Sequence, residues 1–166
     1  MPELANIIRH LIKHDIKFVL VGGYAAIAHG STMMTQDVDI CLDFSTENLL
    51  ILQSALADLH PVHRMTPQRK PLTLTPDNCQ SIQNLYLDTD LGQLDCLSSI
   101  KGVGDYLAVL AASIPISLPA GMCRILSLDA LIQAKSAMGR ARDQEVVIQL
   151  RALREQSSET HNPPNL

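Results

Sequence analysis

The chain has 166 residues, of which 46% are hydrophobic and 18% charged, a composition that excludes an intrinsically disordered protein. A net charge of −4 and an aromatic content of 3% argue against a protein that coats nucleic acid and stacks bases on aromatic side chains. No apolar run approaches the roughly 20 residues that span a bilayer, and the N-terminus lacks the pattern of a signal peptide. We therefore expect one cytoplasmic domain with no membrane contact.

The first part of the chain alternates between helical and extended patterns. Apolar residues at helical spacing predict helices, and short continuous or alternating apolar runs predict strands. In chain order these segments are a helix over 4–12, a buried strand over 18–21, a short helix over 24–28, a half-buried strand over 37–43 and a helix over 49–59. The strand over 18–21 stops at a pair of glycines, Gly22 and Gly23.

The segment over 61–80 interrupts this alternation with prolines and basic residues, and we expect an exposed loop there with at most short strands. Further on, apolar periodicity and an N-cap residue, Ser127, predict regular structure again. These elements are a hairpin of strands over 82–87 and 93–97, a helix near 103–112, apolar pieces near 114–118 and 123–126, a helix over 128–138 and a last helix to 154. The expected domain is therefore 1–154, with a helical part over about 127–154 and a disordered tail over 155–166.

Two acidic residues mark the strand over 37–43. Side chains two residues apart on a strand point to the same face, so Asp37 and Asp39 project together. Two unpaired carboxylates side by side cost several kcal/mol to bury, so a cation is expected to compensate them. Oxygen ligands of this kind suit Mg²⁺, which completes its coordination shell with water and substrate phosphates. A solvated strand face is the alternative interpretation of the pair taken alone.

The glycines upstream strengthen the first interpretation. Gly22 and Gly23 lie where a buried strand turns directly into a helix. Glycine lets a ligand approach the backbone closely, and the amides that begin a helix attract phosphate. A tightly packed turn is the alternative. A phosphate cradle and a carboxylate pair on neighbouring strands are together more specific than either feature alone.

This arrangement resembles a known signature. Residues 21–23 (Val-Gly-Gly), a spacer and residues 37–40 (Asp-Val-Asp-Ile) are similar to the signature of the DNA polymerase beta superfamily of nucleotidyltransferases. The surrounding residues resemble its small, single-domain bacterial branch, which includes toxin–antitoxin and abortive-infection members. The resemblance implies an α/β (α+β) fold, with a mixed β-sheet flanked by helices and a helical C-terminal segment. It also implies a third acid on a later strand, for which Asp95 is the match.

The resemblance further implies a reaction and a set of site residues. A nucleoside monophosphate would pass from ATP or another nucleoside triphosphate to a hydroxyl acceptor, with release of pyrophosphate. The acceptor would be a small molecule, a protein hydroxyl or a tRNA end. Two Mg²⁺ ions would be held by the three acids, two glycines would line the phosphates and a lysine would reach one of them. The residues so assigned are Asp37, Asp39 and Asp95 for metal binding and catalysis, and Gly22, Gly23 and Lys135 for nucleotide binding.

One departure from the family pattern keeps a second function open. Small relatives often carry an arginine between the glycines and the first acid, where this chain has Met33. A missing cation would weaken triphosphate binding or abolish catalysis. The alternative is therefore a catalytically silent nucleotide-binding module or toxin–antitoxin partner of the same fold, acting through a partner protein. A Mg²⁺-dependent phosphate-ester hydrolase ranks last, because no general base or hydrolytic motif supports it.

Some of these residues also have ordinary structural interpretations. Asp95 could simply end a strand, and Lys135 could be a solvated helix residue. Arg140 and Asp143, three residues apart on a helix, are predicted to pair on its surface, which is worth a few tenths of a kcal/mol. The basic segment 64–70 could serve a nucleic-acid acceptor but is expected to be a solvated loop.

Overall fold

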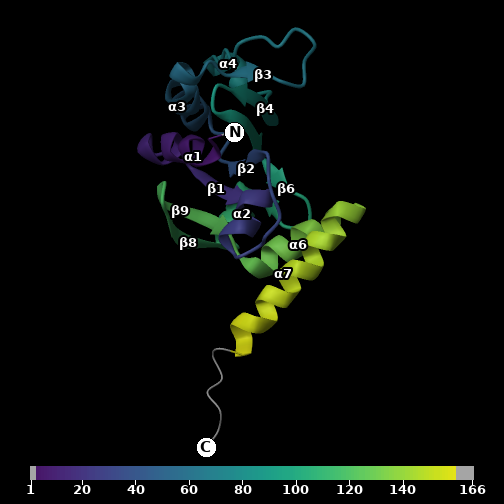
Figure 1. Cartoon of the computed structure of the whole chain (residues 1–166). Coiled ribbons are helices and arrows are strands. Elements are labelled where there is room, and N and C mark those ends of the chain that lie inside the picture. The colour runs from purple at the N-terminus through teal and green to yellow at the C-terminus, as the bar shows by residue number, and fades with distance from the viewer. Residues whose placement is uncertain (1–2, 160–166) are drawn as a thin grey trace, which may run out of the picture.

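The computed structural model describes residues 3–159, in which helices surround a central sheet (Figure 1). The helices are α1 (Leu4–Lys13), α2 (Gly22–Ala28), α3 (Thr46–Leu56), α4 (Pro76–Cys79), α5 (Tyr106–Ala111), α6 (Leu128–Met138) and α7 (Ala141–Glu159), with a 3₁₀ turn at Ala57–Leu59. The strands are β1 (Phe18–Val21), β2 (Asp37–Leu42), β3 (Val62–His63), β4 (Asn84–Thr89), β5 (Gly92–Leu97), β6 (Ser99–Ile100), β7 (Gly104–Asp105), β8 (Ser113–Leu118) and β9 (Gly121–Leu126).

Within the described residues, seven strands form one mixed sheet in the order β3-β4-β5-β2-β1-β9-β8, and β6 and β7 pair separately. The pairs β2–β5 and β1–β9 are parallel, and the remaining pairs of the large sheet are antiparallel. The middle strands β5 and β2 come from distant parts of the chain. Their parallel pairing sets Asp37 and Asp39 of β2 beside Gln93 and Asp95 of β5.

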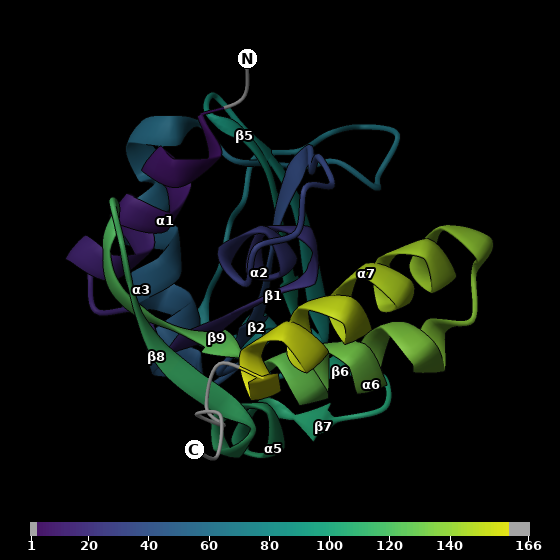
Figure 2. The same cartoon turned by 60° about the horizontal axis from the view of Figure 1, so that its bottom comes forward.

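The hydrophobic core lies on the face of β2 opposite to its acidic residues. Val38, Ile40 and Leu42 are fully buried, as are Ile7 and Leu11 of α1. Helices α1 and α3 lie on one side of the strands, and the antiparallel pair α6–α7 lies on the other (Figure 2). The expected fold class, a mixed sheet flanked by helices with a helical C-terminal segment, is confirmed.

Most predicted elements are present, and the differences have local causes. Ser127 caps α6 as predicted, since its hydroxyl accepts a hydrogen bond from the amide of Ala130. The segment 61–80 is largely exposed with short elements, as expected, but it packs onto the body through Leu72, Leu74 and Cys79, which are buried. None of the helices in the described part of the chain is long and apolar enough to cross a membrane.

The end of the chain differs from the prediction. Helix α7 continues to Glu159, so the predicted disordered tail is wrong for residues 155–159. Val146, Val147 and Leu150 anchor this helix in the core, and its polar end extends from that anchor. Residues 160–166 of the predicted tail lie outside the described residues.

Candidate active site

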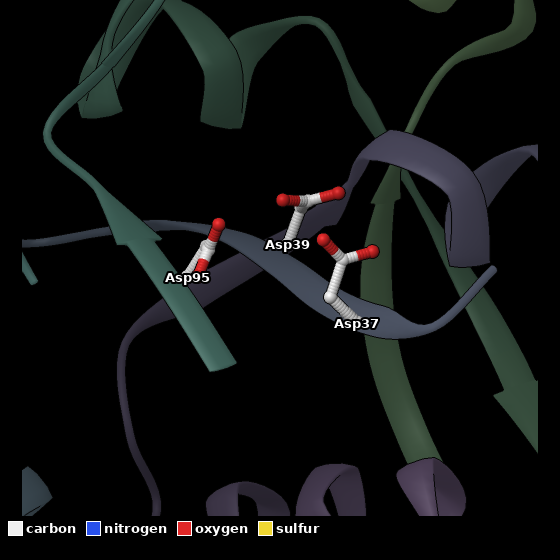
Figure 3. Close-up of side chains that lie close together, drawn as sticks. All are labelled: Asp37, Asp39 and Asp95. Carbon is white, nitrogen blue, oxygen red and sulfur yellow. The ribbon is translucent and has the colours of Figure 1, made fainter. Parts of the chain in front are cut away.

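The three predicted acids meet at the centre of the sheet. Because β2 and β5 run parallel in a register that pairs Asp39 with Asp95, these two side chains stand side by side. Asp37 projects to the same face as Asp39, two residues away along β2. One carboxylate oxygen from each of the three lies within 4.8 Å of the other two, and the three carboxyl groups converge (Figure 3). Their metal-binding and catalytic roles stay predictions.

The two glycines allow α2 to begin directly against this cluster. Val21 is opposite Asp39 in the β1–β2 ladder, and Gly22 follows with a φ of +64°. A Cβ on Gly22 would lie 2.1 Å from Oδ2 of Asp39, so no larger residue fits. The backbone amide of Gly23 donates a hydrogen bond to the Asp39 carboxylate. Gly22 is thus explained by its close approach to the carboxylate of Asp39, and the role of both glycines towards phosphates stays a prediction.

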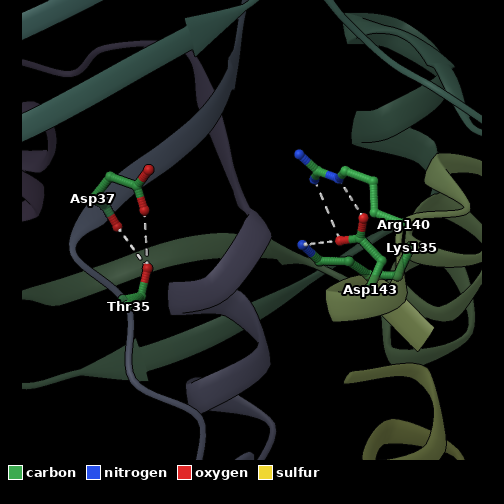
Figure 4. Close-up of polar contacts among 5 residues, drawn as sticks. All are labelled: Thr35, Asp37, Lys135, Arg140 and Asp143. Atoms are coloured by element: carbon green, nitrogen blue, oxygen red, sulfur yellow. Dashed lines mark hydrogen bonds and ion pairs between the residues drawn. The ribbon is translucent and has the colours of Figure 1, made fainter. Parts of the chain in front are cut away.

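A threonine before β2 orients the first acid. The hydroxyl of Thr35 lies 3.0 Å from Oδ1 of Asp37 and donates to it (Figure 4). Gly23 leaves room for this hydroxyl, since a Cβ there would be 2.6 Å from Oγ1 of Thr35. The loop that precedes β2 therefore fixes the rotamer of Asp37.

Burial and crowding make the cluster reluctant to carry its full negative charge. Desolvation raises the pKa of Asp39 to about 7, with further contributions from the neighbouring charges of Asp37 and Asp95. Lys135 and the amide of Gly23 act in the opposite direction without reversing the shift. Asp95 is only 9% exposed, and desolvation also raises its pKa. Such a cluster is a favourable place for an added cation.

The donor set fits Mg²⁺. The cluster offers carboxylate oxygens only, which is the ligand type that Mg²⁺ prefers. A bound divalent cation would also offset the repulsion that raises the pKa of Asp39. Asp37, Asp39 and Asp95 are therefore the residues that could hold it.

An arginine that the sequence analysis left in a solvated loop contacts the third acid. Arg64 follows β3 directly, and its guanidinium forms an ion pair and hydrogen bond with Asp95. The same guanidinium lies over the ring of Tyr86, 5.7 Å from its centroid. The expectation of a plain solvated loop is therefore wrong for Arg64, because the β3–β4 ladder brings the start of that loop over β5. No short motif in the sequence indicates this contact.

Two cations border the site from α6 and from the turn between α6 and α7. Lys135 of α6 has its Nζ 3.3 Å from Oδ1 of Asp143, and Nε of Arg140 is 2.6 Å from Oδ2 of the same residue (Figure 4). The predicted pairing of Arg140 with Asp143 is thus confirmed. Its expected place on a helix surface is wrong, because Asp143 is only 1% exposed beneath the two cations.

Two adjoining cavities open on either side of the cluster. The larger has a volume of about 450 Å³ and the smaller about 210 Å³. Both are lined by Asp39, Asp95, Lys135 and Arg140. Gly22 lines the larger cavity, whereas Gly23 and Asp37 line the smaller. Every residue that the sequence analysis assigned to the site therefore borders at least one of the two cavities.

No protein-family model and no curated protein matches the sequence. Solved structures do match the fold. The crystal structure of the lincosamide antibiotic adenylyltransferase LnuA with lincomycin bound superposes with a TM-score of 0.62 at 16% identity, over 91% of this chain and 96% of that one. An antigenic nucleotidyltransferase-like protein from Paracoccidioides brasiliensis gives a TM-score of 0.57 at 14% identity, over 90% of this chain and 74% of that one. At these identities the likeness shows that the chain has the fold of nucleotidyltransferases.

Proposed function

We propose that the protein is a Mg²⁺-dependent nucleotidyltransferase, which moves a nucleoside monophosphate from a nucleoside triphosphate to a hydroxyl acceptor and releases pyrophosphate. One observation carries the proposal. Three carboxylates from two parallel strands converge to within 4.8 Å in a fold shared with nucleotidyltransferases. The narrower resemblance to the toxin–antitoxin and abortive-infection branch rests on the sequence and belongs to the same proposal.

The reaction assigns a role to each acid. Asp37, Asp39 and Asp95 would hold the Mg²⁺ that binds the triphosphate, and Asp95 also accepts the proton of the acceptor hydroxyl. The acceptor oxygen forms a bond to the α-phosphorus as the bond from that phosphorus to the bridging oxygen breaks, so pyrophosphate carries away the released electron pair. Bound Mg²⁺ would neutralise phosphate charge and stabilise the attacking and leaving oxygens. The raised pKa of Asp95, which desolvation causes, suits it to accept that proton.

The two cavities suggest how donor and acceptor divide the site. The smaller cavity is bordered by Arg140, Arg142 and Lys135, whose charges suit the triphosphate. The larger cavity is bordered by apolar side chains such as Leu97, Ile100 and Met138, which suit a nucleoside base or the body of a small acceptor. Because LnuA was solved with the small molecule lincomycin, a small hydroxylated molecule is the first acceptor class to test. Protein hydroxyls and tRNA ends follow.

A catalytically silent nucleotide-binding module is the second candidate, and one observation favours it. Met33 borders the smaller cavity, where small relatives often carry an arginine. Such a module would bind a triphosphate, or a partner protein, without turnover. Pyrophosphate release separates the two functions, because a silent module forms none.

The test needs no knowledge of the acceptor. Binding of ATP, GTP, CTP and UTP is measured by calorimetry, with and without Mg²⁺, for the wild type, Asp39→Asn and Asp129→Asn. Asp129 is exposed and borders neither cavity, so its variant is the matched control for the loss of one negative charge. We expect Mg²⁺-dependent binding in the wild type and the control and none in Asp39→Asn. Pyrophosphate release is then followed with candidate acceptors and the nucleotide that binds.

Three outcomes are decisive. Equal binding by Asp39→Asn and the wild type would contradict the metal assignment. If a triphosphate binds but no acceptor class leads to the release of pyrophosphate from it, the silent module is favoured. No binding of any triphosphate would contradict the transferase and the nucleotide-binding module, and would leave only a module that acts through a partner protein.

A further inference from the structure

Asp143 is a buried carboxylate that holds two cations at the edge of the candidate site. It lies in the first turn of α7, where the amides at the start of a helix favour a negative charge. Hydrogen bonds from Arg140 and the charge of Lys135 keep its pKa below the usual value, although burial alone would raise it. Asp143 is therefore a fixed anion, and it sets the position of both cations.

Arg140 uses only one edge of its guanidinium for this contact. Its Nε and Nη2 donate to the two oxygens of Asp143, at 2.6 and 3.4 Å. Nη1 has no hydrogen-bond partner among residues 3–159, and the side chain is 63% exposed. The outer edge of the fork, formed by Nη1 and Nη2, is therefore available to a ligand. A guanidinium presents two parallel N–H groups along such an edge, which matches the oxygens of a phosphate.

The position of this edge points to a particular ligand. Arg140 borders both cavities together with Asp39, and it borders the smaller one together with Met33. Met33 brings no charge to that cavity, whereas Arg140, Arg142 and Lys135 do. Of the two arginines, Arg140 is the one that hydrogen bonds to Asp143 hold in place. Arg140 lies in the turn between α6 and α7 and is not needed to join these helices, since the contacts of Lys135 with Asp143 and of Arg154 with Asp129 already do so.

We propose that Arg140 binds the polyphosphate of the nucleoside triphosphate and that Asp143 is its positioning residue. This inference rests on the function proposed above and adds a binding residue to it. Asp143 holds one edge of the guanidinium and turns the other towards the donor. Arg140 thereby supplies the smaller cavity with the charge that an arginine at position 33 would otherwise bring.

The test uses inorganic tripolyphosphate with Mg²⁺ as the probe, because it carries the charge of the donor without its base. Dissociation constants are measured by calorimetry for the wild type, Arg140→Gln, Arg140→Lys and Asp143→Asn, and for the four nucleoside triphosphates in parallel. The matched control is Asp129→Asn, which breaks an exposed Asp–Arg contact, that of Asp129 with Arg154, away from both cavities. Circular dichroism at each binding temperature verifies that every variant is folded.

We expect Arg140→Gln to weaken tripolyphosphate binding by about ten- to hundredfold, the range for a hydrogen bond to a charged group. Arg140→Lys should recover part of this loss, since it restores the charge but not the fork. Asp143→Asn should weaken binding by about tenfold if folded, and Asp129→Asn by less than about twofold. In the transfer reaction, Arg140→Gln should raise KM for the triphosphate more than it lowers kcat.

The outcomes separate this inference from the function on which it rests. If the wild type binds and Arg140→Gln binds as tightly as Asp129→Asn, Arg140 is a structural residue and only this inference fails. If the wild type binds neither tripolyphosphate nor any nucleoside triphosphate, both fail. If Asp143→Asn does not fold, the two Arg140 variants still decide, because that side chain is mostly exposed.

Discussion

Two aspartate–arginine contacts lie within the same site and behave in opposite ways. Asp95 is paired with Arg64, and Asp143 with Arg140. Both aspartates are buried, with side chains that are 12% and 2% exposed. The pKa of Asp95 is nevertheless raised, whereas that of Asp143 is lowered.

Their neighbours account for the difference. Desolvation acts to raise both pKa values, but around Asp95 the charge of Asp37 adds to it and Arg64 does not offset the sum. Around Asp143, Arg140 and Lys135 together outweigh burial. One carboxylate is thus under-compensated and suited to a metal, and the other is committed to positioning cations. An ion pair alone does not reveal which role a buried carboxylate has.

The largest effect is expected when the cluster around Asp95 loses one of its acids. Asp39→Asn removes a proposed metal ligand, so nucleotidyl transfer should fall by more than about a hundredfold, beyond the usual effect of altering a group that only supports a ligand. The same change removes like-charge repulsion, so the metal-free variant should unfold at the same or a higher temperature than the wild type. A thermal melt in EDTA beside a transfer assay tests both. A variant that lost stability and kept transfer would reverse our assignment.

The pH dependence of stability should also distinguish the acids of the cluster from Asp143. Because folding raises the pKa of Asp39 from 3.8 to about 7, the folded protein binds a proton there that the unfolded chain has lost. The free energy of unfolding in EDTA should therefore fall between pH 4 and 7, by up to about 4 kcal/mol at 1.36 kcal/mol per pKa unit. Asp143, whose pKa is lowered, contributes stability above about pH 4 that is lost as the pH falls further.

Urea denaturation at pH 4.5, 5.5, 6.5 and 7.5 measures this slope. Mg²⁺ should flatten it at the upper end, since a bound cation replaces the proton, and Asp39→Asn should flatten it without metal. Stability that increased over this range in EDTA would show that Asp39 is not desolvated as described.

Asp143→Asn, which removes the carboxylate that holds Arg140 and Lys135, should cost about 2–3 kcal/mol of folding free energy. Breaking a fully buried ion pair costs about 3–5 kcal/mol, and the exposure of Arg140 reduces the expected loss. The comparison is Asp129→Asn, whose exposed contact with Arg154 should be worth less than about 1 kcal/mol. Urea denaturation at pH 7 measures both variants. Equal losses would mean that Asp143 is no more than an ordinary surface partner.

The smallest effect is expected at Arg64. Arg64→Gln should lower the free energy of unfolding by about 1 kcal/mol, because one charged hydrogen bond is lost while Asp95 gains access to water. The affinity for Mg²⁺ should increase by a few-fold, since the guanidinium no longer competes for Asp95. A magnesium titration followed by thermal shift measures this. Weaker magnesium binding would instead make Arg64 a residue that positions Asp95.

The sequence predicted those parts of the site that depend on local geometry. The period of a strand places Asp37 and Asp39 on one face, and the serine before α6 marks where that helix begins. Asp95 was named through a family resemblance, and only the β2–β5 register explains why it meets Asp39. That register depends on strand pairing across a long stretch of chain, which no local pattern specifies.

The missed features depend on tertiary packing. The contact of Arg64 with Asp95 requires the β3–β4 ladder, and the burial of Asp143 requires α7 to fold back on α6. The helix to Glu159 was missed because its last residues are polar, and a polar sequence alone does not distinguish an exposed helical turn from a disordered tail.

The parallel pairing of β9 with β1 has a consequence for the order in which the protein is made. All three acids emerge from the ribosome before β9, which pairs with β1, and before α6 and α7. At that stage the growing chain carries all three acids and Arg64, whereas Lys135 and Arg140 are still unmade. Because domains fold as units during synthesis, those like charges oppose early closure of the sheet. The cationic side of the site is thereby completed last, when the final helices arrive.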